Sequence, residues 1–313
     1  MHNFQWFLLA FLLTNGFLTH LRAAPSEIVV AIRYLQQTGA SHAHLFLFRE
    51  DGTVLRQLTK DDSGQDRNPV FAPDGETIVF TRELPDGVKQ PWSVEPRGNN
   101  LHLLDAAPDW YRQTKNSPHF AYPEDKVDAP TPTPPNATRP VFPINDLTAV
   151  VLVPTADADK ENPDEWTAMF REKNGHETAV GHVSGWMPRQ LLCQESALQV
   201  AFIFTSLGST DSATVYAVGP GKGEFARLAR NWAAPFPLPG DAAFLTFAEE
   251  RYVPFGDGSH TANCSYVDRW DAALKRVRYA RKDAAAICNG ASMYRPGKTP
   301  AVVTMLAGDA ASD

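Results

Sequence analysis

Short apolar runs alternate with turn residues along this chain, and residues 68–104 show the pattern most clearly. The predicted strands of this stretch are Val70–Phe71, Thr77–Thr81, Pro91–Glu95 and Leu101–Leu104. The segments Pro73-Asp74-Gly75, Pro85-Asp86-Gly87 and Gly98-Asn99-Asn100 separate them, and these residue types favour tight turns because proline fixes φ and glycine accepts a positive φ. β-branched and aromatic residues suit a pleated, half-buried surface. The stretch therefore predicts a four-stranded antiparallel unit.

The same rhythm recurs before and after this unit. The spacing from Ile28 to Thr77 is close to 50 residues, which is within the range of propeller blades. Further units are predicted in Glu27–Thr59, from Pro140, in Arg189–Ala229 and from Pro235. The last strand-like runs, Ile287–Tyr294 and Pro300–Leu306, can join Glu27–Thr59 in a shared closing blade. The prediction is an all-β fold, a β-propeller of four-stranded antiparallel blades. A six-bladed ring with an incomplete or shared closing blade is favoured over five full blades and a shared one.

These units resemble the WD40-like (PD40) repeats of TolB-type β-propellers. The matching residues are Ala72-Pro73-Asp74-Gly75, Ile78–Arg82, Trp92–Glu95 and Arg56-Gln57-Leu58-Thr59. The resemblance implies an exported scaffold that binds protein partners in the cell envelope. The N-terminal α/β domain of TolB has no counterpart here, so only the propeller carries over. Similar repeats also precede the hydrolase domain of prolyl-oligopeptidase-type peptidases, which is not expected in this sequence.

Composition and the N-terminus indicate one exported domain. The chain has 313 residues, 43% of them hydrophobic, and a formal charge of −7, which argues against a nucleic-acid surface. An apolar run, Phe4–Phe17, precedes small residues, as in a secretory signal peptide. We predict a signal peptide at 1–23, a propeller domain at 24–308 and a tail at 309–313. A periplasmic or secreted location follows. The alternative is an uncleaved membrane anchor.

Two features fall outside the blade pattern. The segment 123–140 is rich in proline, which cannot donate ladder hydrogen bonds, so it predicts an exposed loop inserted between blades. Cys264 and Cys288 can form a disulfide if neighbouring strands bring them together. The alternative is that these and Cys193 are small buried hydrophobic residues.

The search for catalytic residues finds only incomplete motifs. Gly181-His182-Val183-Ser184-Gly185 places its serine one position late for a nucleophile elbow. His176-Glu177 lacks the second histidine of a zinc protease. His42 and His44 share a strand face, but no third metal ligand is close in sequence. We predict no catalytic residue, no metal and no cofactor.

Binding is therefore the predicted activity, with a protein or peptide partner in the envelope and a monomeric chain. Loop residues with aromatic or charged side chains are the candidates for contact. They are Trp110, Tyr111, Arg112, Asp157 and Asp159. The alternative is a hydrolase or lactonase with acidic or histidine groups at the central channel. The predicted core residues are Ile78, Phe80, Val151, Phe202 and Phe204.

Overall fold

The computed structural model describes residues 26–114, 120–121, 139–158, 163–193, 198–206, 213–219, 226–230, 236–238, 242–255, 260–298 and 300–303. Nearly all regular elements in these ranges are antiparallel strands, so the all-β prediction is confirmed. The predicted signal peptide, the tail 309–313 and most of the proline-rich segment lie outside the described residues. Among the described residues, no helix combines the length and apolar character needed to cross a bilayer.

The described strands form four sheets, and the largest, of nine strands, divides into two blade-like units, so five units are distinguished. One consists of β4 (Gln65–Phe71), β5 (Ile78–Glu83), β6 (Lys89–Val94) and β7 (His102–Leu103). The next along the chain consists of β9 (Val141–Asn145), β10 (Thr148–Pro154), β11 (Glu165–Arg171) and β12 (Glu177–Ser184). The third consists of β13 (Trp186–Cys193), β14 (Ala201–Ser206), β15 (Ala213–Val218) and β16 (Ala226–Arg230), with β8 (Phe120–Ala121) added beside β13. The fourth consists of β17 (Phe236–Pro237), β18 (Ala243–Phe255), β19 (His260–Asp271) and β20 (Arg276–Arg278).

The fifth unit is shared between the two ends of the described chain. Its N-terminal strands are β1 (Glu27–Tyr34), β2 (Ala43–Arg49) and β3 (Val54–Gln57), and its C-terminal strand is β21 (Ala286–Tyr294). β21 runs antiparallel to β1, with Ile28 opposite Met293 and Val30 opposite Ala291. The short strand β22 (Ala301–Val303) pairs with the other edge of β21. The predicted pairing of Ile287–Tyr294 with the first unit is thus observed.

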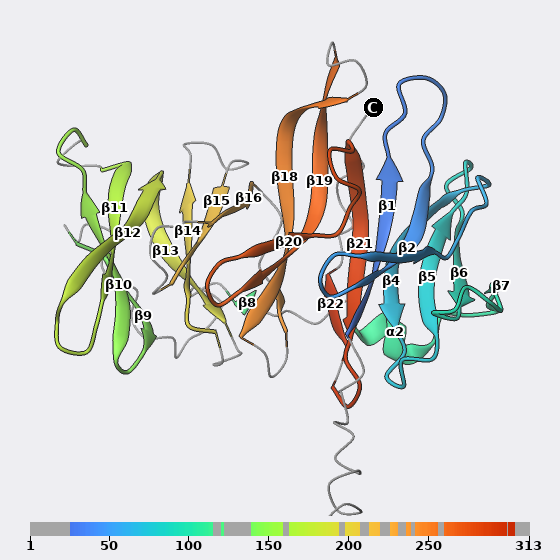
Figure 1. Ribbon diagram of the computed structural model, residues 1–313, viewed down its shortest axis with the longest axis horizontal. Helices are drawn as coiled ribbons and strands as arrows, with labels where there is room; N and C mark the ends of the chain where they lie inside the picture. The colour runs from blue at the N-terminus through green and yellow to red at the C-terminus, as the bar shows by residue number, and fades with distance from the viewer. Residues whose placement is uncertain are drawn as a thin grey trace, which may run out of the picture.

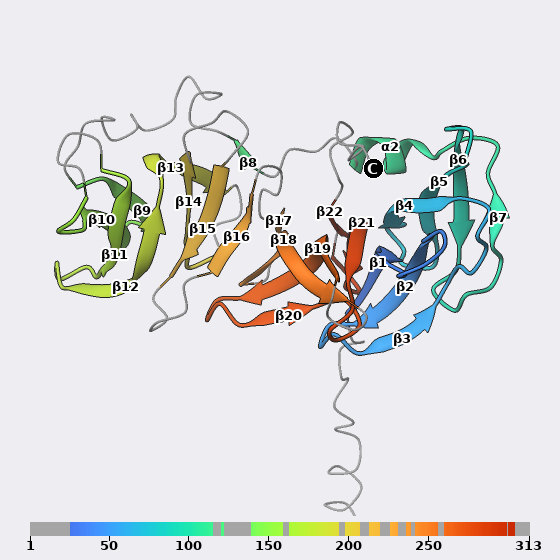
Figure 2. The same cartoon turned by 90° about the horizontal axis from the view of Figure 1, so that it is seen from above.

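The five units stand in a curved row (Figures 1 and 2). Their spatial order is β4–β7, then the shared unit, then β17–β20, β13–β16 and β9–β12. This is the cyclic order of a propeller opened between β7 and β9. The described strands give five units in a row, so the predicted six-bladed ring is not confirmed.

Apolar clusters hold each unit to the next. Phe71, Ile78 and Phe80 of the β4–β7 unit pack with Val29 and Leu45 of the shared unit. Similar clusters join the shared unit to β17–β20, β17–β20 to β13–β16, and β13–β16 to β9–β12. Strand residues alternate between two faces, so each inner unit contributes one face to each of its neighbours.

Among the described residues, a helix covers the far face of the β4–β7 unit. Helix α2 (Asp109–Thr114) places Tyr111 against Val70 of β4 and Val79 of β5, and Val302 of β22 joins them. Figure 2 shows α2 beside β4 and β22. Helix α2 thus covers part of the β4–β7 surface that faces away from the shared unit.

Four of the five predicted core residues are almost fully buried: Ile78, Phe80, Val151 and Phe202. Phe204 packs against its cluster but is only partly buried. Trp166 and Trp270 are also buried between units, as expected for the recurring tryptophans.

Candidate functional site

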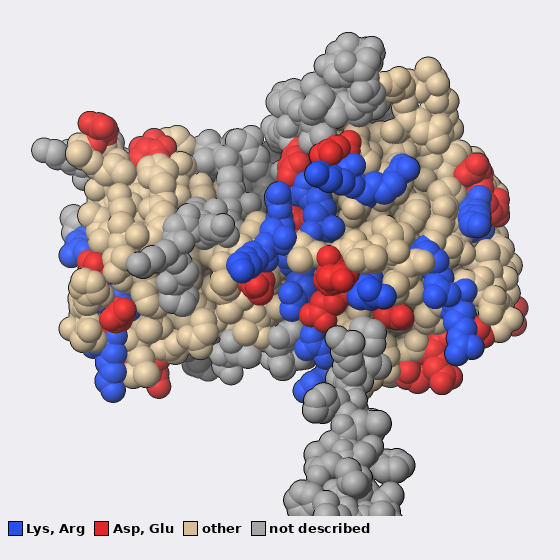
Figure 3. All heavy atoms as spheres, in the orientation of Figure 1, with Lys and Arg blue, Asp and Glu red and all other residues tan. Residues whose placement is uncertain are grey.

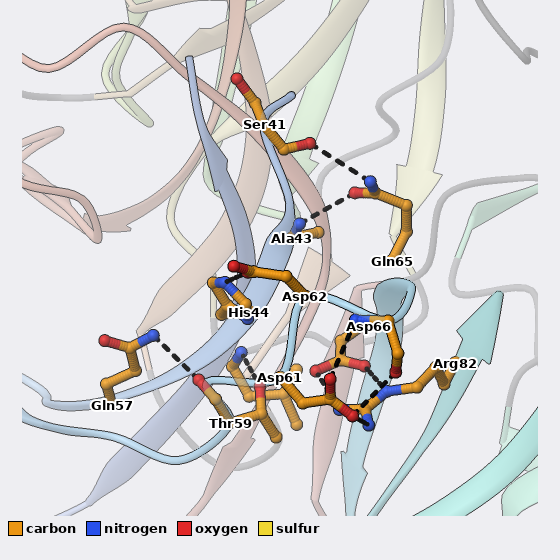
Figure 4. Close-up of polar contacts among 12 residues, drawn as sticks. Ser41, Ala43, His44, Gln57, Thr59, Asp61, Asp62, Gln65, Asp66 and Arg82 are labelled. Carbon is orange, nitrogen blue, oxygen red and sulfur yellow. Dashed lines mark hydrogen bonds and ion pairs between the residues drawn. The ribbon is translucent and has the colours of Figure 1, made fainter. Parts of the chain in front are cut away.

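A polar network fills the junction between the shared unit and the β4–β7 unit (Figure 4). At its centre Arg82 of β5 donates to both carboxylate oxygens of Asp66, from Nε at 2.7 Å and from Nη2 at 3.1 Å. Both side chains are only 1% exposed. The guanidinium carbon lies 4.7 Å from the ring centroid of Trp92, which gives a cation–π contact. Arg82 is thus fixed by a bidentate ion pair and an aromatic face.

The same guanidinium holds the loop that follows β3. Arg82 Nη1 donates to Asp61 Oδ2 at 3.0 Å, and the Ser63 amide and hydroxyl donate to the same carboxyl group. The Ser63 hydrogen bonds, with a smaller contribution from the charge of Arg82, lower the pKa of Asp61 below its ordinary value. Asp61 is therefore held by Ser63 and by an arginine that it shares with Asp66.

Three more contacts tie this loop to β2. The Leu45 amide donates to Thr59 Oγ1 at 2.9 Å, and the Ala43 amide donates to Gln65 Oε1 at 2.8 Å. His44 Nε2 lies 3.1 Å from Asp62 Oδ1, as Figure 4 shows. His44 thus faces a carboxylate of the loop that joins the two units. In the described part of the chain no group of three or more His, Cys, Asp or Glu side chains is placed to hold a metal ion.

Beside this network lies an open hollow of about 620 Å³, which we call the β3 hollow. It is lined by Leu55, Arg56, Gln57, Leu58, Lys60, Asp61, Arg97, Gly98 and Leu101. Strand β3 and its following loop form one wall, and the turn between β6 and β7 forms the other. Arg56 Nη1 donates to the Arg97 carbonyl at 3.1 Å across the hollow. Sequence reasoning used residues 56–59 only as a repeat signature and missed the hollow, because Arg97 approaches them only through the packing of two units.

The structure corrects the placement of the predicted aromatic binding residues. Tyr111 and its neighbours form helix α2 and not an open loop, and Tyr111 is only 4% exposed. Its hydroxyl donates to the Asn68 carbonyl at 2.9 Å and lies 3.0 Å from Thr81 Oγ1. Burial raises the pKa of Tyr111 to about 12. Tyr111 was predicted as an exposed contact, but it is a packing residue. Trp110 is half-buried and packs against the same cluster.

The charged candidates lie far apart along the row. Arg112 is exposed and pairs with Asp109 on the same helix. Asp157 is exposed in the turn after β10, while Asp159 lies outside the described residues. Because α2 belongs near one end of the row and β10 to the other (Figure 2), the structure does not bring Arg112 and Asp157 into one site.

Two residues of the incomplete nucleophile-elbow motif, His182 and Ser184, contact a carboxylate in the folded chain. His182 and Ser184 lie on one face of β12, opposite Glu165 at the start of β11. Both side chains contact Glu165 Oε2, with the Ser184 hydroxyl donating at 3.1 Å. In a nucleophile–base pair the serine would contact the histidine. Here the carboxylate stands between them, so the group is a carboxylate with two polar neighbours.

Both described cysteine side chains are buried free thiols. Cys264 and Cys288 lie on β19 and β21, which touch through a bridge between Ser265 and Ile287. The two strands are thus neighbours, but the structure holds no disulfide between the two cysteines. Burial raises the pKa of Cys288 to about 12.

The basic and acidic side chains of the described residues are interleaved on the face shown in Figure 3.

On β18–β20, Arg278 donates to both oxygens of the buried Asp268 at 2.9 Å and stacks 4.0 Å from the Tyr266 ring centroid. This arrangement repeats the geometry of Arg82, Asp66 and Trp92 in another unit. Burial, only partly opposed by Arg278, raises the pKa of Asp268 above its ordinary value. Paired arginines that stack on aromatic rings are thus a structural feature of more than one unit.

The fold and the junction network define the chain as an all-β protein of four-stranded antiparallel units closed by strands from both ends of the described chain. No protein-family model matches it, and no curated protein matches it. Among solved structures, a nidogen/laminin complex aligns over 86% of this chain and 98% of its own, with 10% identity and a TM-score of 0.28. TolB from Acinetobacter baumannii aligns over 88% of this chain, with 10% identity and a TM-score of 0.27, and this chain spans 63% of its length. An oligogalacturonate lyase in complex with manganese aligns over 92% of this chain and 95% of its own, with 10% identity and a TM-score of 0.22. Likenesses at these scores carry no information on activity or partner.

Proposed function

We propose that this chain is an exported β-propeller scaffold that binds a protein or peptide partner in the cell envelope and does not catalyse a reaction. The observation that carries the proposal is the pairing of β21 with β1. This pairing fixes the two ends of the described chain in one unit, and the buried pair of Arg82 and Asp66 fixes the adjoining unit. Such a framework supports exposed connecting segments in constant positions, which is the arrangement on which binding surfaces are commonly built.

Export is part of the proposal and rests on the apolar run Phe4–Phe17 and the small residues that follow it. The mature protein from its native host should begin at or near Ala24. N-terminal sequencing tests this directly. A cytosolic species that retains Met1 would refute export, and a membrane-bound species that retains it would indicate the uncleaved anchor.

The binding proposal is tested by capture of a partner from envelope extract with purified protein as bait. Arg112→Ala and Asp157→Ala are suitable single variants because both side chains are exposed. At least one of them should weaken capture if the predicted charged contacts are used. Equal capture by both variants and wild type would leave the scaffold in place and remove these residues from its contact surface.

A hydrolase is the second candidate, and the contacts of Glu165 with His182 and Ser184 favour it. A carboxylate beside a histidine and a serine hydroxyl can act as a general base when a substrate or water proton lies within its reach. The same purified protein should be assayed with esterase, lactonase and glycosidase substrates. Turnover that is abolished by Glu165→Gln would replace the scaffold proposal with the hydrolase. Absence of turnover with all three substrate classes is the expected result.

A further inference from the structure

We propose that the β3 hollow binds an extended acidic peptide segment that carries apolar side chains. This inference rests on the proposed scaffold function, since it assigns the peptide to the partner. The hollow lies between the outermost strand of the shared unit and the turn that joins β6 to β7. It is separate from the helix and from the acidic turn that carry the contact residues predicted from the sequence.

The lining of the hollow has a local excess of positive charge. Arg56, Lys60 and Arg97 are exposed at its rim, and the ion pairs found among the described residues involve none of them. Asp61 is the one acidic residue in the lining, so three cations face one carboxylate, which also accepts hydrogen bonds from Arg82 and Ser63. In a chain with a formal charge of −7, three such cations around one hollow form a site for an anionic ligand.

The floor of the hollow is apolar. Leu58 is 6% exposed and lies under the turn, where a Cβ built on Gly98 would be 4.0 Å from Leu58 Cδ2. Leu101 is 37% exposed, and Leu55 is half-buried beside it. A free inorganic anion would contact the rim and leave these leucines in water. A ligand that combines carboxylates with apolar side chains would cover both.

The shape of the site favours a peptide in extended conformation. Four consecutive lining residues, 55–58, come from β3 and its end. Within the described residues β3 pairs with β2 along one edge, so it is the edge strand of its unit. A peptide laid along an edge strand gains main-chain hydrogen bonds and points alternate side chains to opposite sides. Glutamates can then reach the cations while leucines meet the apolar floor.

The test is a fluorescence anisotropy titration of the full-length mature protein with a labelled nonapeptide of alternating glutamate and leucine. The matched peptide replaces each glutamate with glutamine. We expect saturable binding of the acidic peptide, weakened by a rise in salt from about 50 to about 300 mM because exposed charges are screened. The double variant Lys60→Gln/Arg97→Gln should bind about tenfold more weakly, the size expected for two exposed charge pairs.

A control double variant, Lys173→Gln/Lys275→Gln, removes the same net charge from exposed positions outside the hollow and should bind as wild type does. Circular dichroism checks that each variant is folded, and Arg56→Gln provides an independent loss of one rim cation. Equal affinity for the two peptides would overturn the proposal, as would an equal loss in the test and control variants. Displacement of the peptide by citrate at the same carboxylate concentration would also overturn it, because the hollow would then be a plain anion site. The scaffold proposal is decided separately, because the capture assay uses natural partners from envelope extract and the titration uses a synthetic peptide.

Discussion

The hydroxyl of Tyr111 donates to the main-chain carbonyl of Asn68 at 2.9 Å, and this contact fastens α2 to the innermost strand of the β4–β7 unit. Asn68 lies in the left-handed region, with φ of 49°, at the irregularity between Arg67 and Val70 in the pairing of β4 with β5. The bulge exposes a carbonyl that the sheet does not use, and the tyrosine satisfies it. Tyr111, which was predicted to bind a partner, instead packs against the outer face of the β4–β7 unit.

Tyr111→Ala should destabilise the fold by about 3–5 kcal/mol, the cost of deleting a buried aromatic side chain. Tyr111→Phe keeps the ring and should cost about 1 kcal/mol through the lost hydrogen bond. Urea titration measures both. Arg112→Ala on the same helix is the control and should lie within about 0.5 kcal/mol of wild type because its side chain is exposed. A loss below about 1 kcal/mol for Tyr111→Ala would contradict the assigned packing role.

Gly290→Ala should weaken the closure of the shared unit. Gly290 has φ of 108° and lies so close to β4 that an added Cβ would come within 2.8 Å of the Asn68 Cα. We expect a loss of about 1–3 kcal/mol from overpacking, in addition to the backbone strain. Gly297→Ala is the matched control, since its φ is 76° but no atom lies within 4 Å of the added Cβ. Equal losses in thermal or urea unfolding would show that β21 does not approach β4 so closely.

Asp66→Ala should be among the most damaging polar substitutions. It leaves the guanidinium of Arg82, only 1% exposed, without its bidentate partner and with only the half-exposed Asp61 beside it, and removing one partner of a buried ion pair costs about 3–5 kcal/mol. Asp109→Ala removes the partner of another arginine, but at an exposed site, and should have little effect on the free energy of unfolding. Similar unfolding midpoints for the two variants would refute the buried position of the Arg82 pair.

The pKa of Asp61 should lie below its ordinary range, chiefly because the Ser63 side chain donates to the ionised carboxylate. The sign follows from linkage: a carboxyl group whose pKa is lowered on folding stabilises the native state above its unfolded pKa. That contribution is lost as the pH falls below about 4, through the lowered value. Carboxyl-carbon NMR titration measures the pKa directly. Ser63→Ala should raise it, and an unchanged value would remove Ser63 as the cause.

The thiols of Cys264 and Cys288 should be unreactive in the native protein because both are buried and burial raises the pKa of Cys288. Thiolate is the reactive form, so a disulfide-exchange reagent should label these two residues only after denaturation. A thiol count on protein that was denatured without reductant should then reach three, the number of cysteines in the chain. A count of one, rising to three after reduction, would establish the disulfide predicted from the sequence.

The sequence by itself determined the local structure. Pro-Asp-Gly turns and runs such as Thr77–Thr81 carry their conformational preference in their own residue types, so the strands and the four-stranded units could be predicted from short windows. The shared unit could also be predicted, since Ile287–Tyr294 and Glu27–Thr59 each supply too few strands for a four-stranded unit.

Only the tertiary structure decided which faces meet. The sequence presents the Trp110–Arg112 segment as an exposed loop, because nothing nearby in the chain marks Val70 and Val79 as the surface it covers. The β3 hollow could not be predicted for the same reason. Arg56 and Arg97 are 41 positions apart in the sequence and meet only when two units pack. Periodicity encodes contacts within a unit, whereas contacts between units depend on shape, which a local pattern does not contain.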